Sequence, residues 1–306
     1  MKNIVILGDT GFIGRHLVRR LTSNEDYTVV GYSRAPTFSG KYFKHYSQDI
    51  LDLDTLLTEF TQTKNKLDAI VYLVGLTKHE DIAGKKDLML RLHTQGVLNA
   101  LRLAEITDCK KFIYLSSGKV YGNSSEDGIL DESCKTHPTT FLGTCKKMAE
   151  DILMNICLPG TIIARLFNAY GPRQSENYLV SKVIKNAIET GEVDLETLEP
   201  IRDYVYVKDV CSAIEVFLEN PTYTFQFANI STGIGTSVGN IVRHVSKILN
   251  KEIKVVNSKK KRYGETPVEI GILSKYLTSN GWKPRSVEEG LKLTIEEFQK
   301  CKNLKS

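Results

Sequence analysis

The sequence has few cysteines, no paired-cysteine motif and no long apolar run. Its six cysteines are scattered over positions 109, 134, 145, 157, 211 and 301, which predicts free thiols and argues against a disulfide framework or a zinc site. Apolar stretches such as 4–7 are far shorter than the roughly 20 residues of a membrane span. The N-terminus does not resemble a signal peptide. We therefore expect a cytoplasmic protein with no bound metal and no membrane contact.

The charge balance is not extreme either. The 306 residues carry a formal net charge of +5, which suits an anionic small molecule as well as nucleic acid. No nucleic-acid-binding motif accompanies this charge, so we expect no nucleic-acid partner. Hydrophobic residues make up 41% of the chain, enough for a large core. Without a repeat or a Pro/Gly-rich linker, two lobes packed together are expected.

Residues 1–167 are predicted to form a Rossmann-type α/β domain. Short β-branched runs that predict strands alternate with helical patterns, at 3–7, 27–32, 68–74, 111–115 and 160–166. One helix is indicated by apolar residues at three- and four-residue spacing, namely Leu53, Leu56, Leu57 and Phe60. This alternation with apolar strands predicts a doubly wound parallel sheet covered by helices on both faces.

Residues 168–306 are predicted to form a smaller α+β lobe that is free to exchange segments with the first domain. In this part of the chain, predicted strands and helices no longer alternate regularly. Helices are expected at 179–190, 210–219, 238–249 and 287–302, and strands at 225–229 and 253–256.

Three glycines follow the first predicted strand in the stretch GDTGFIG at 8–14. Glycines at this spacing allow a tight turn, close approach of the backbone to a phosphate, and close packing of the next helix on the sheet. The start of that helix would present free N–H groups and a positive dipole end to a pyrophosphate. The turn predicts a nicotinamide dinucleotide site with contacts from Gly8, Gly11, Phe12, Ile13 and Gly14.

The end of the second predicted strand bears on the choice of dinucleotide. A carboxylate there binds the ribose 2′-OH, whereas a cation accommodates a 2′-phosphate. The residues present are Ser33 and Arg34, which favours NADP(H) and leaves NAD(H) possible, with a solvated Arg34 as the alternative. Asp49 and Ile50, at the end of a further strand expected between those at 27–32 and 68–74, are expected at the adenine ring.

Four further motifs follow the glycine turn, LSSGKVYG at 115–122, RLFNAYGPRQ at 165–174, RDYVYVKDV at 202–210 and GWKP at 281–284. With the three glycines, they make the chain similar to the extended short-chain dehydrogenase/reductase family, in particular to its nucleotide-sugar epimerases, dehydratases and 4-ketoreductases. The resemblance covers nearly the whole chain. It implies that residues 1–167 bind the dinucleotide and that residues 168–306 mainly bind a nucleotide sugar.

The resemblance also implies a catalytic serine, tyrosine and lysine. In such enzymes the serine polarises the substrate, the tyrosine shuttles a proton, and the lysine binds the nicotinamide ribose and lowers the pKa of the phenol. Ser117 matches the serine, which also contacts substrate, and Lys146 matches the lysine. The tyrosine position is occupied by Leu142, which can neither donate nor accept a proton.

Several groups are candidates to replace the missing tyrosine. Tyr121 is the first, with a packing role as its alternative. Ser117, Thr144, Cys145 or a water are others, although Cys145 also fits a small packing residue. A protein that binds its ligands without turnover is a further possibility.

Two more departures concern positions 93 and 268. His93 stands where the family commonly has asparagine; it would hydrogen-bond similarly, or simply pack within a helix. Val268 stands where an arginine usually reaches the diphosphate of the substrate. The resemblance leaves Asn168 and Arg202 as substrate-binding residues, with a turn asparagine and an ion pair to Asp203 or Asp209 as the structural alternatives. The basic run at 259–262 would border the diphosphate or form a solvated turn.

These observations predict an NADP(H)-preferring reductase of a 4-keto(-6-deoxy) sugar nucleotide. The alternatives are an epimerase similar to UDP-glucose 4-epimerase, a 4,6-dehydratase, or a cofactor-binding regulator or scaffold that has lost catalysis. The acidic insertion that dehydratases use beside the tyrosine position is not present near Leu142. The resemblance also implies a homodimer, with helices around 88–106 and 141–157 as candidates for its interface.

Overall fold

The chain divides into two units in a computed structural model that describes residues 1–63, 66–76, 84–156, 158, 160–220, 226–256 and 266–303. The first unit consists of Met1–Gly122, Thr136–Arg165 and Cys211–Ala228. The second consists of Asn123–Lys135, Leu166–Val210 and Asn229–Ser306. The chain therefore passes from one unit to the other five times, after Gly122, Lys135, Arg165, Val210 and Ala228. The sequence had indicated one main boundary, between 167 and 168.

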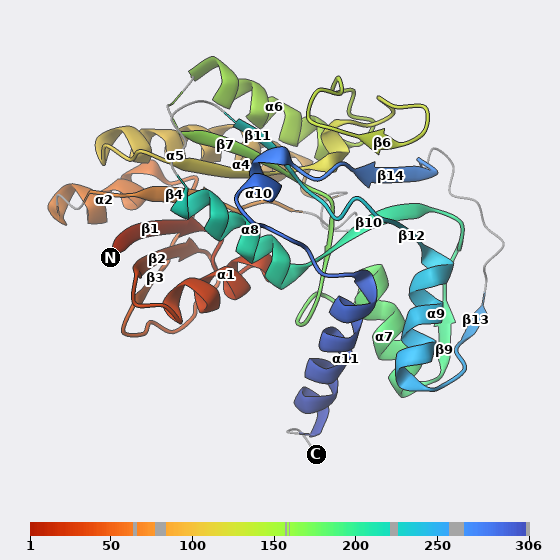
Figure 1. The fold of residues 1–306 in the computed structure, drawn as a ribbon. Coiled ribbons are helices and arrows are strands. Elements are labelled where there is room, and N and C mark those ends of the chain that lie inside the picture. Colours follow the sequence, from red (N-terminus) through yellow and green to blue (C-terminus); the bar gives the residue numbers. More distant parts are fainter. Residues whose placement is uncertain are drawn as a thin grey trace. The chain divides into compact units, whose positions relative to one another are not determined.

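A seven-stranded sheet forms the centre of the first unit, in the order β11-β7-β5-β4-β1-β2-β3 (Figure 1). Its strands are β1 (Lys2–Leu7), β2 (Tyr27–Ser33), β3 (Phe43–Ser47), β4 (Ala69–Tyr72), β5 (Phe112–Ser117), β7 (Thr161–Leu166) and β11 (Gln226–Ile230). β1 pairs in parallel with both β2 and β4, and β3 and β5 pair in parallel with β2 and β4. Because these strands pair in parallel, their carboxyl ends share one edge of the sheet. The chain order reverses at β1, and ligands bind at this edge where such a reversal occurs.

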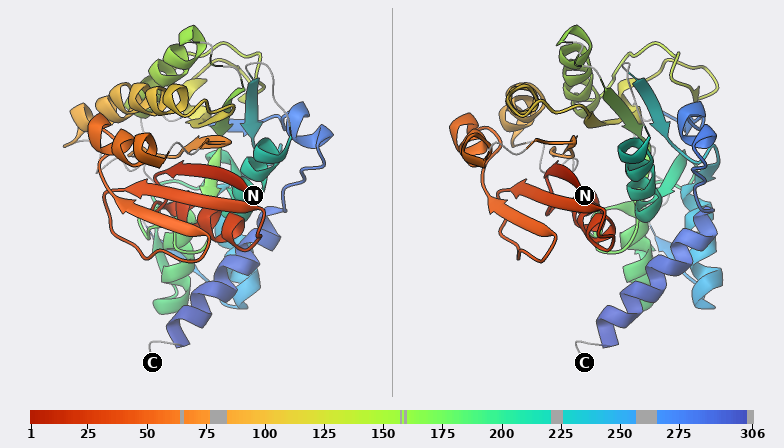
Figure 2. Two further views of the ribbon diagram at one scale, coloured as in Figure 1. Left: turned by 90° about the vertical axis from the view of Figure 1, so that its left-hand side faces the viewer. Right: turned by 60° about the vertical axis from the view of Figure 1, so that its left-hand side comes forward.

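Helices cover both faces of this sheet (Figure 2). They are α1 (Phe12–Thr22), α2 (Leu53–Thr63), α4 (Lys86–His93), α5 (Gln95–Ile106), α6 (Phe141–Ile156) and α8 (Val207–Glu219). On one face, α2, α5 and α6 bury residues in a cluster with Val5 and Leu7. Ile4 and Ile6 are equally buried and alternate to the opposite face, where α1 and α8 are joined by the ion pair Arg20–Glu215.

The predicted Rossmann fold is confirmed, with one correction among its helices. The helix expected over 88–106 is two helices, α4 and α5, separated by Thr94. Among the described residues, no helix is long and apolar enough to span a membrane.

The second unit contains a five-stranded mixed sheet in the order β12-β10-β14-β6, with β8 pairing to β10. Its strands are β6 (Ile129–Leu130), β8 (Asn168–Tyr170), β10 (Ile201–Tyr206), β12 (Gly235–Ser237) and β14 (Val268–Gly271). β9 (Glu192–Asp194) and β13 (Lys254–Val256) form a separate parallel pair. The helices of this unit are α7 (Leu179–Glu189), α9 (Val238–Leu249), α10 (Lys275–Ser279) and α11 (Val287–Asn303), and α8 begins within it.

Helix α9 shows how local sequence sets these elements. Ser237 caps its start by accepting a hydrogen bond from the amide of Asn240 at 3.1 Å. Its buried residues, Val238, Ile241, Val242 and Val245, recur at helical spacing. Asn250 ends it in the left-handed conformation at φ 50°. The helix therefore has the bounds that its sequence predicts.

Candidate functional site

The glycine turn after β1 depends on all three of its glycines. Gly8 has φ 95°, a backbone conformation that favours glycine. A Cβ on Gly14 would lie 2.2 Å from the carbonyl oxygen of Gly8, so the first turn of α1 packs directly against the loop. The amide of Gly11 donates to that same carbonyl at 3.1 Å. The loop is thus compact and brings backbone, rather than side chains, to the surface of the turn.

The start of α1 is open to an anion. Gly11 is the N-cap residue, no side chain caps the helix, and its first turn holds no acidic residue. The first amides of a helix lack intrahelical acceptors and carry the positive end of its dipole. Phe12 and Ile13 provide these amides and are themselves half-buried. The residues present therefore fit a pyrophosphate at this turn.

The end of β2 lies beside the glycine turn. The Thr10 hydroxyl donates to Ser33 Oγ at 2.8 Å, and Ser33 Oγ donates to the carbonyl of Ala35 at 3.1 Å. Arg34 is exposed. The structure thus joins Ser33 to the glycine turn and leaves the Arg34 guanidinium at the surface next to it.

The sequence did not predict a buried pair of ionisable side chains in this turn. Asp9 Oδ2 lies 2.7 Å from His45 Nδ1, and both side chains are almost fully buried. Asp9 packs over Gly31 of β2, where any Cβ would lie 2.3 Å from Oδ2. The glycine at position 31 was a signal in the sequence that another group packs over β2. The sequence did not show that His45 pairs with Asp9, because 36 residues separate them.

Asp49 and Ile50 lie just beyond β3, which ends earlier than expected, at Ser47. Asp49 Oδ1 accepts a hydrogen bond from the amide of Leu51 at 3.0 Å. The Ile50 side chain is buried in the core, and its carbonyl accepts from Asn99 at 2.8 Å. Asp49 is therefore the more accessible of the two.

Ser117 is the last residue of β5 and the N-cap of a short 3-10 turn, Gly118–Val120. Its Oγ accepts a hydrogen bond from the amide of Lys119 at 3.2 Å. The side chain is half-buried at the carboxyl edge of the sheet. Its hydroxyl hydrogen can therefore donate to a ligand oxygen.

Lys146 reaches the same strand from α6. Its Nζ donates to the carbonyl of Leu115 at 2.6 Å and lies 4.9 Å from the centre of the Tyr114 ring. Complete burial lowers the pKa of Lys146 to about 7, and the charge of Glu150 opposes that fall. Ser117 and Lys146, which the sequence pairs only by resemblance, thus both lie at the end of β5.

His93 and Tyr114 form a second buried contact beside Lys146. Tyr114 Oη lies 2.9 Å from His93 Nδ1, and neither side chain is exposed. Among the residues that the structure describes, His93 Nε2 has no hydrogen-bond partner. Burial, followed by the charge of Lys146, lowers the pKa of His93 well below its usual value. His93 is therefore a buried, neutral imidazole rather than a group that titrates near neutrality.

Tyr121 is fully buried, with its ring 4.7 Å from the Arg165 guanidinium. Arg165 also forms a bidentate contact with Glu150, from Nη2 to Oε2 at 2.8 Å and from Nε to Oε1 at 3.1 Å. Ser116 Oγ donates to Glu150 Oε1 at 2.5 Å. This environment suits the packing role that was the alternative for Tyr121.

Leu142 is partly buried and packs with an apolar cluster. The cluster consists of Met89, Cys145 and the partly buried Leu76, Leu90, Phe141 and Leu142. Burial raises the pKa of the Cys145 thiol. Position 142 therefore contributes packing between α4 and α6 and no titratable group.

The two predicted substrate residues belong to the second unit. Asn168 begins β8 and donates to the carbonyl of Asp203 at 3.1 Å. Arg202 of β10 is nearly buried, and its Nη1 donates to the carbonyls of Ile201 and Pro267 at 2.9 and 3.3 Å.

The acidic neighbour of Arg202 is Glu269, with Nε to Oε2 at 3.9 Å. The alternative partners expected from sequence are wrong. Asp203 instead accepts hydrogen bonds from Thr232, and Asp209 pairs with Arg285.

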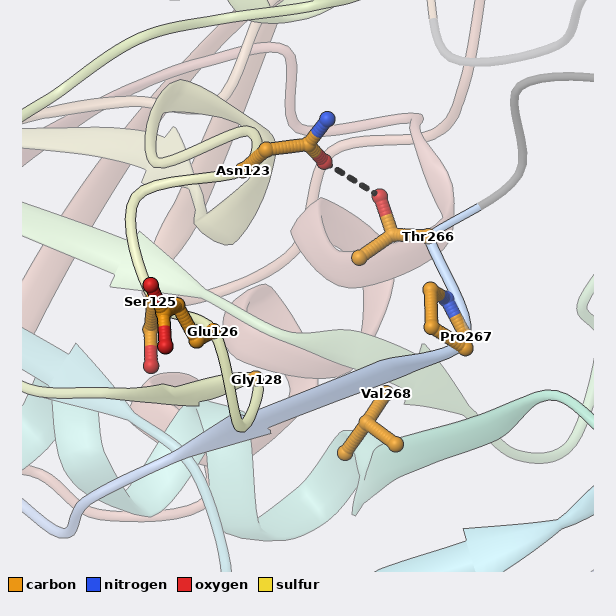
Figure 3. A pocket seen from close by; sticks show the side chains of 7 residues that line it. All are labelled: Asn123, Ser125, Glu126, Gly128, Thr266, Pro267 and Val268. Carbon is orange, nitrogen blue, oxygen red and sulfur yellow. Dashed lines mark hydrogen bonds between the residues drawn. The ribbon is translucent and has the colours of Figure 1, made fainter.

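A cavity of about 380 Å³ also lies in the second unit (Figure 3). Its lining consists of Asn123, Ser125, Glu126, Gly128, Thr266, Pro267 and Val268. Thr266 donates to Asn123 at 3.1 Å across one side. Among the described residues of this lining none is a cation, and Glu126 is acidic. The basic run at 259–262 lies outside the described residues.

The described part of the chain contains neither a metal site nor a disulfide. No group of three or more His, Cys, Asp or Glu side chains is placed to hold a metal there. Cys109, Cys134, Cys145 and Cys211 are free thiols, as expected.

Comparison with known proteins agrees with this fold and glycine turn. The chain belongs to the NAD dependent epimerase/dehydratase family, whose model matches residues 4–230. The resemblance drawn from the sequence motifs is thereby confirmed.

Individual relatives are distant and differ in activity. One is a trifunctional UDP-glucose 4,6-dehydratase/UDP-4-keto-6-deoxy-D-glucose 3,5-epimerase/UDP-4-keto-L-rhamnose-reductase of Arabidopsis thaliana, 27% identical over 97% of this chain. The chain spans only 47% of that relative. The GDP-6-deoxy-D-talose 4-dehydrogenase of Aggregatibacter actinomycetemcomitans is 27% identical over 91% of both chains.

A solved structure is similar over the whole chain. The UDP-glucose 4-epimerase of Thermotoga maritima, determined with UDP-glucose, has a TM-score of 0.87 and 28% identity, covering 98% of this chain and 99% of its own.

Proposed function

We propose that this protein is an NAD(P)-dependent oxidoreductase of nucleotide sugars that reduces a 4-keto sugar intermediate. The observation that carries the proposal is the edge of one sheet, where the glycine turn follows β1, and Ser117 and the Nζ of Lys146 lie at the end of β5. Membership of the family and the nucleotide-sugar substrates of its relatives support the substrate class.

The dinucleotide would be held by the glycine turn and the open start of α1. When bound, it supplies or accepts a hydride. We assign Asp49 to the adenine end, since Ile50 turns its side chain into the core. Ser117 would donate to the reacting oxygen, while Asn168 and Arg202 of the second unit would bind the nucleotide sugar. Arginine suits that role because its guanidinium offers five N–H donors to a diphosphate.

Preference for NADP(H) is proposed from Ser33 and Arg34. The exposed guanidinium at the end of β2 is available to a 2′-phosphate, and no carboxylate stands at that strand end. Replacing Arg34 with Ser should weaken NADPH binding by about tenfold, the value of one charge-assisted contact, and leave NADH binding unchanged. Equal losses for both dinucleotides would refute the preference.

Two further properties are proposed. The protein acts as a homodimer through α5 and α6, which expose Leu98, Ile106, Met148 and Ile156. It works in the cytoplasm, where the four free thiols would stay reduced.

The direct test incubates the purified protein with NADPH or NADH and a panel of nucleotide 4-keto-6-deoxy sugars, following absorbance and product. Epimerisation is the second candidate, favoured by the similarity to the Thermotoga maritima structure. An epimerase would interconvert UDP-sugars without net consumption of dinucleotide. Binding without any turnover would instead support the regulator or scaffold.

A further inference from the structure

The structure narrows the choice of proton donor left open by Leu142. Tyr121 is fully buried beside Arg165. The buried thiol of Cys145 packs with the apolar cluster, and burial raises its pKa. Thr144 is exposed, and its hydroxyl donates to the carbonyl of Thr140 at 3.1 Å. None of these groups lies in a setting suited to proton transfer at the end of β5.

Lys146 has the opposite properties. Its ammonium is buried at the end of β5, and its hydrogen bond to the Leu115 carbonyl uses one of three N–H groups. Glu150, one turn further along α6, is already engaged by Arg165 and Ser116. The carboxylate therefore offsets the charge of Lys146 without taking its protons.

His93 faces the same place from α4. The buried Tyr114 hydroxyl needs an acceptor and finds it in His93 Nδ1, which leaves the ring hydrogen of the neutral imidazole on Nε2. A methyl group built on Gly75 would lie 3.0 Å from His93 Nε2 and 3.8 Å from Lys146 Nζ. Both nitrogens thus lie beside Gly75, just beyond β4. A buried donor left without an acceptor costs about 1–3 kcal/mol.

The ionisable groups around Lys146 set when it gives up a proton. Cys145 and Glu150 lie on its own helix, His93 on α4 and Tyr114 on β5. Burial outweighs the charges of Glu150 and Cys145 and brings the pKa of Lys146 to about 7. The Tyr114 phenol stays protonated, because burial raises its pKa well above the usual value.

We propose that Lys146 is itself the proton donor of the reaction and that His93, with its tautomer set by Tyr114, presents Nε2–H to the same substrate oxygen. The inference rests on the proposed reductase function and replaces the missing tyrosine with groups already at the site. Together with Ser117, which donates to the same oxygen in the proposed function, these donors stabilise the negative charge that develops there.

A reduced nicotinamide dinucleotide, when bound, would supply the hydride for the carbonyl carbon of the 4-keto sugar and would be left oxidised. The carbonyl oxygen takes a proton from Lys146 Nζ, so that an alcohol forms and the lysine is left as a neutral amine. Solvent then returns the proton. His93 keeps its own hydrogen throughout and acts as a hydrogen-bond donor.

The first test measures titration of Lys146 in the protein without ligand, by ¹⁵N NMR of lysine Nζ assigned with Lys146→Arg. We expect protonation to change near neutral pH. The imidazole ¹⁵N shifts should also report hydrogen on His93 Nε2 in the wild type and a mixture of tautomers in Tyr114→Phe. Lysine titration above pH 9 would overturn the proposal, as would a His93 ring with its hydrogen on Nδ1.

The second test measures turnover and NADPH binding in the same variants. Arginine keeps the charge but does not release a proton near neutrality, so Lys146→Arg should lower turnover by about 10²–10⁴-fold. Lys147→Arg, at the neighbouring position that pairs with Asp151, should retain turnover. Turnover retained in Lys146→Arg, or lost in Tyr121→Phe, would refute Lys146 as donor. Failure of the wild type to bind any dinucleotide would refute the proposed function, while the NMR titration still decides the inference.

Discussion

Replacing Glu150 with Gln should destabilise the first unit strongly. The carboxylate is completely buried and receives two bonds from the nearly buried Arg165 and one from Ser116. Breaking such a pair leaves an uncompensated buried charge, at a cost of about 3–5 kcal/mol. Whole proteins are stable by only about 5–15 kcal/mol. At roughly 2–4 °C per kcal/mol, the midpoint of thermal unfolding should fall by about 10 °C.

The assay is thermal unfolding followed by circular dichroism at pH 7.5, with Glu105→Gln as the matched control. Glu105 forms an ion pair with Arg102 on α5, but both side chains are more than half exposed. Exposed pairs contribute only about 0–1 kcal/mol. The control should therefore move the midpoint by no more than about 3 °C.

A double variant separates the charge effect from the loss of packing. In Glu150→Gln with Arg165→Met, neither member of the ion pair leaves an unpaired charge in the core, so part of the lost stability should return. Equal losses for Glu150→Gln and Glu105→Gln would refute the reasoning. A double variant less stable than Glu150→Gln would instead show that contact of Arg165 with Tyr121 and Phe227 matters more than the ion pair.

Three other predictions address the turn, the lysine and the dimer. Gly14→Ala should weaken dinucleotide binding, measured by fluorescence, and lower the free energy of unfolding by about 1–3 kcal/mol, because the new Cβ would lie 2.2 Å from the Gly8 carbonyl oxygen. In the control Gly40→Ala the new Cβ meets nothing within 4 Å, so binding and stability should both be unchanged. The free energy of unfolding should rise as pH rises above about 7, because the unfolded chain keeps the Lys146 proton over a range in which the buried amine loses it. In urea unfolding measured at a series of pH values, Lys146→Met should reduce the rise in the free energy of unfolding with pH. An unchanged dependence on pH would contradict the lowered pKa of Lys146. If the proposed homodimer forms through α5 and α6, Leu98→Glu with Ile156→Glu should halve the mass measured by light scattering. An unchanged mass would refute this interface.

Local patterns predicted helix α9 and, with approximate bounds, every strand of the seven-stranded sheet except β3, because apolar spacing, capping residues and turn glycines act over a few residues. The strands of the five-stranded sheet, β10 among them, were not predicted. The gap at Thr94 was missed because the apolar pattern continues from α4 into α5. Thr94, with φ −113° and ψ −79°, separates the two helices.

Partners distant in sequence were harder to predict. Arg202 has acidic residues nearby in the chain, yet its acidic neighbour is Glu269, which the parallel register of β10 and β14 places beside it. Tyr121 has the same chemistry as a catalytic tyrosine, and only the fold reveals that it is buried beside Arg165. His93 of α4 and Tyr114 of β5 are 21 residues apart and likewise meet only in the fold.

The repeated passage of the chain between the two units has a consequence for biosynthesis. The last segment of the first unit, Cys211–Ala228, supplies most of α8 and the start of the edge strand β11. A ribosome must therefore make about three quarters of the protein before the first unit has all its parts. A truncation after residue 167 would lack Phe217 and Leu218, whose carbonyls accept hydrogen bonds from Lys111. The nucleotide-binding part of this chain should consequently not fold as a simple N-terminal fragment. During synthesis, the incomplete chain should depend on cellular chaperones for longer than a contiguous domain would.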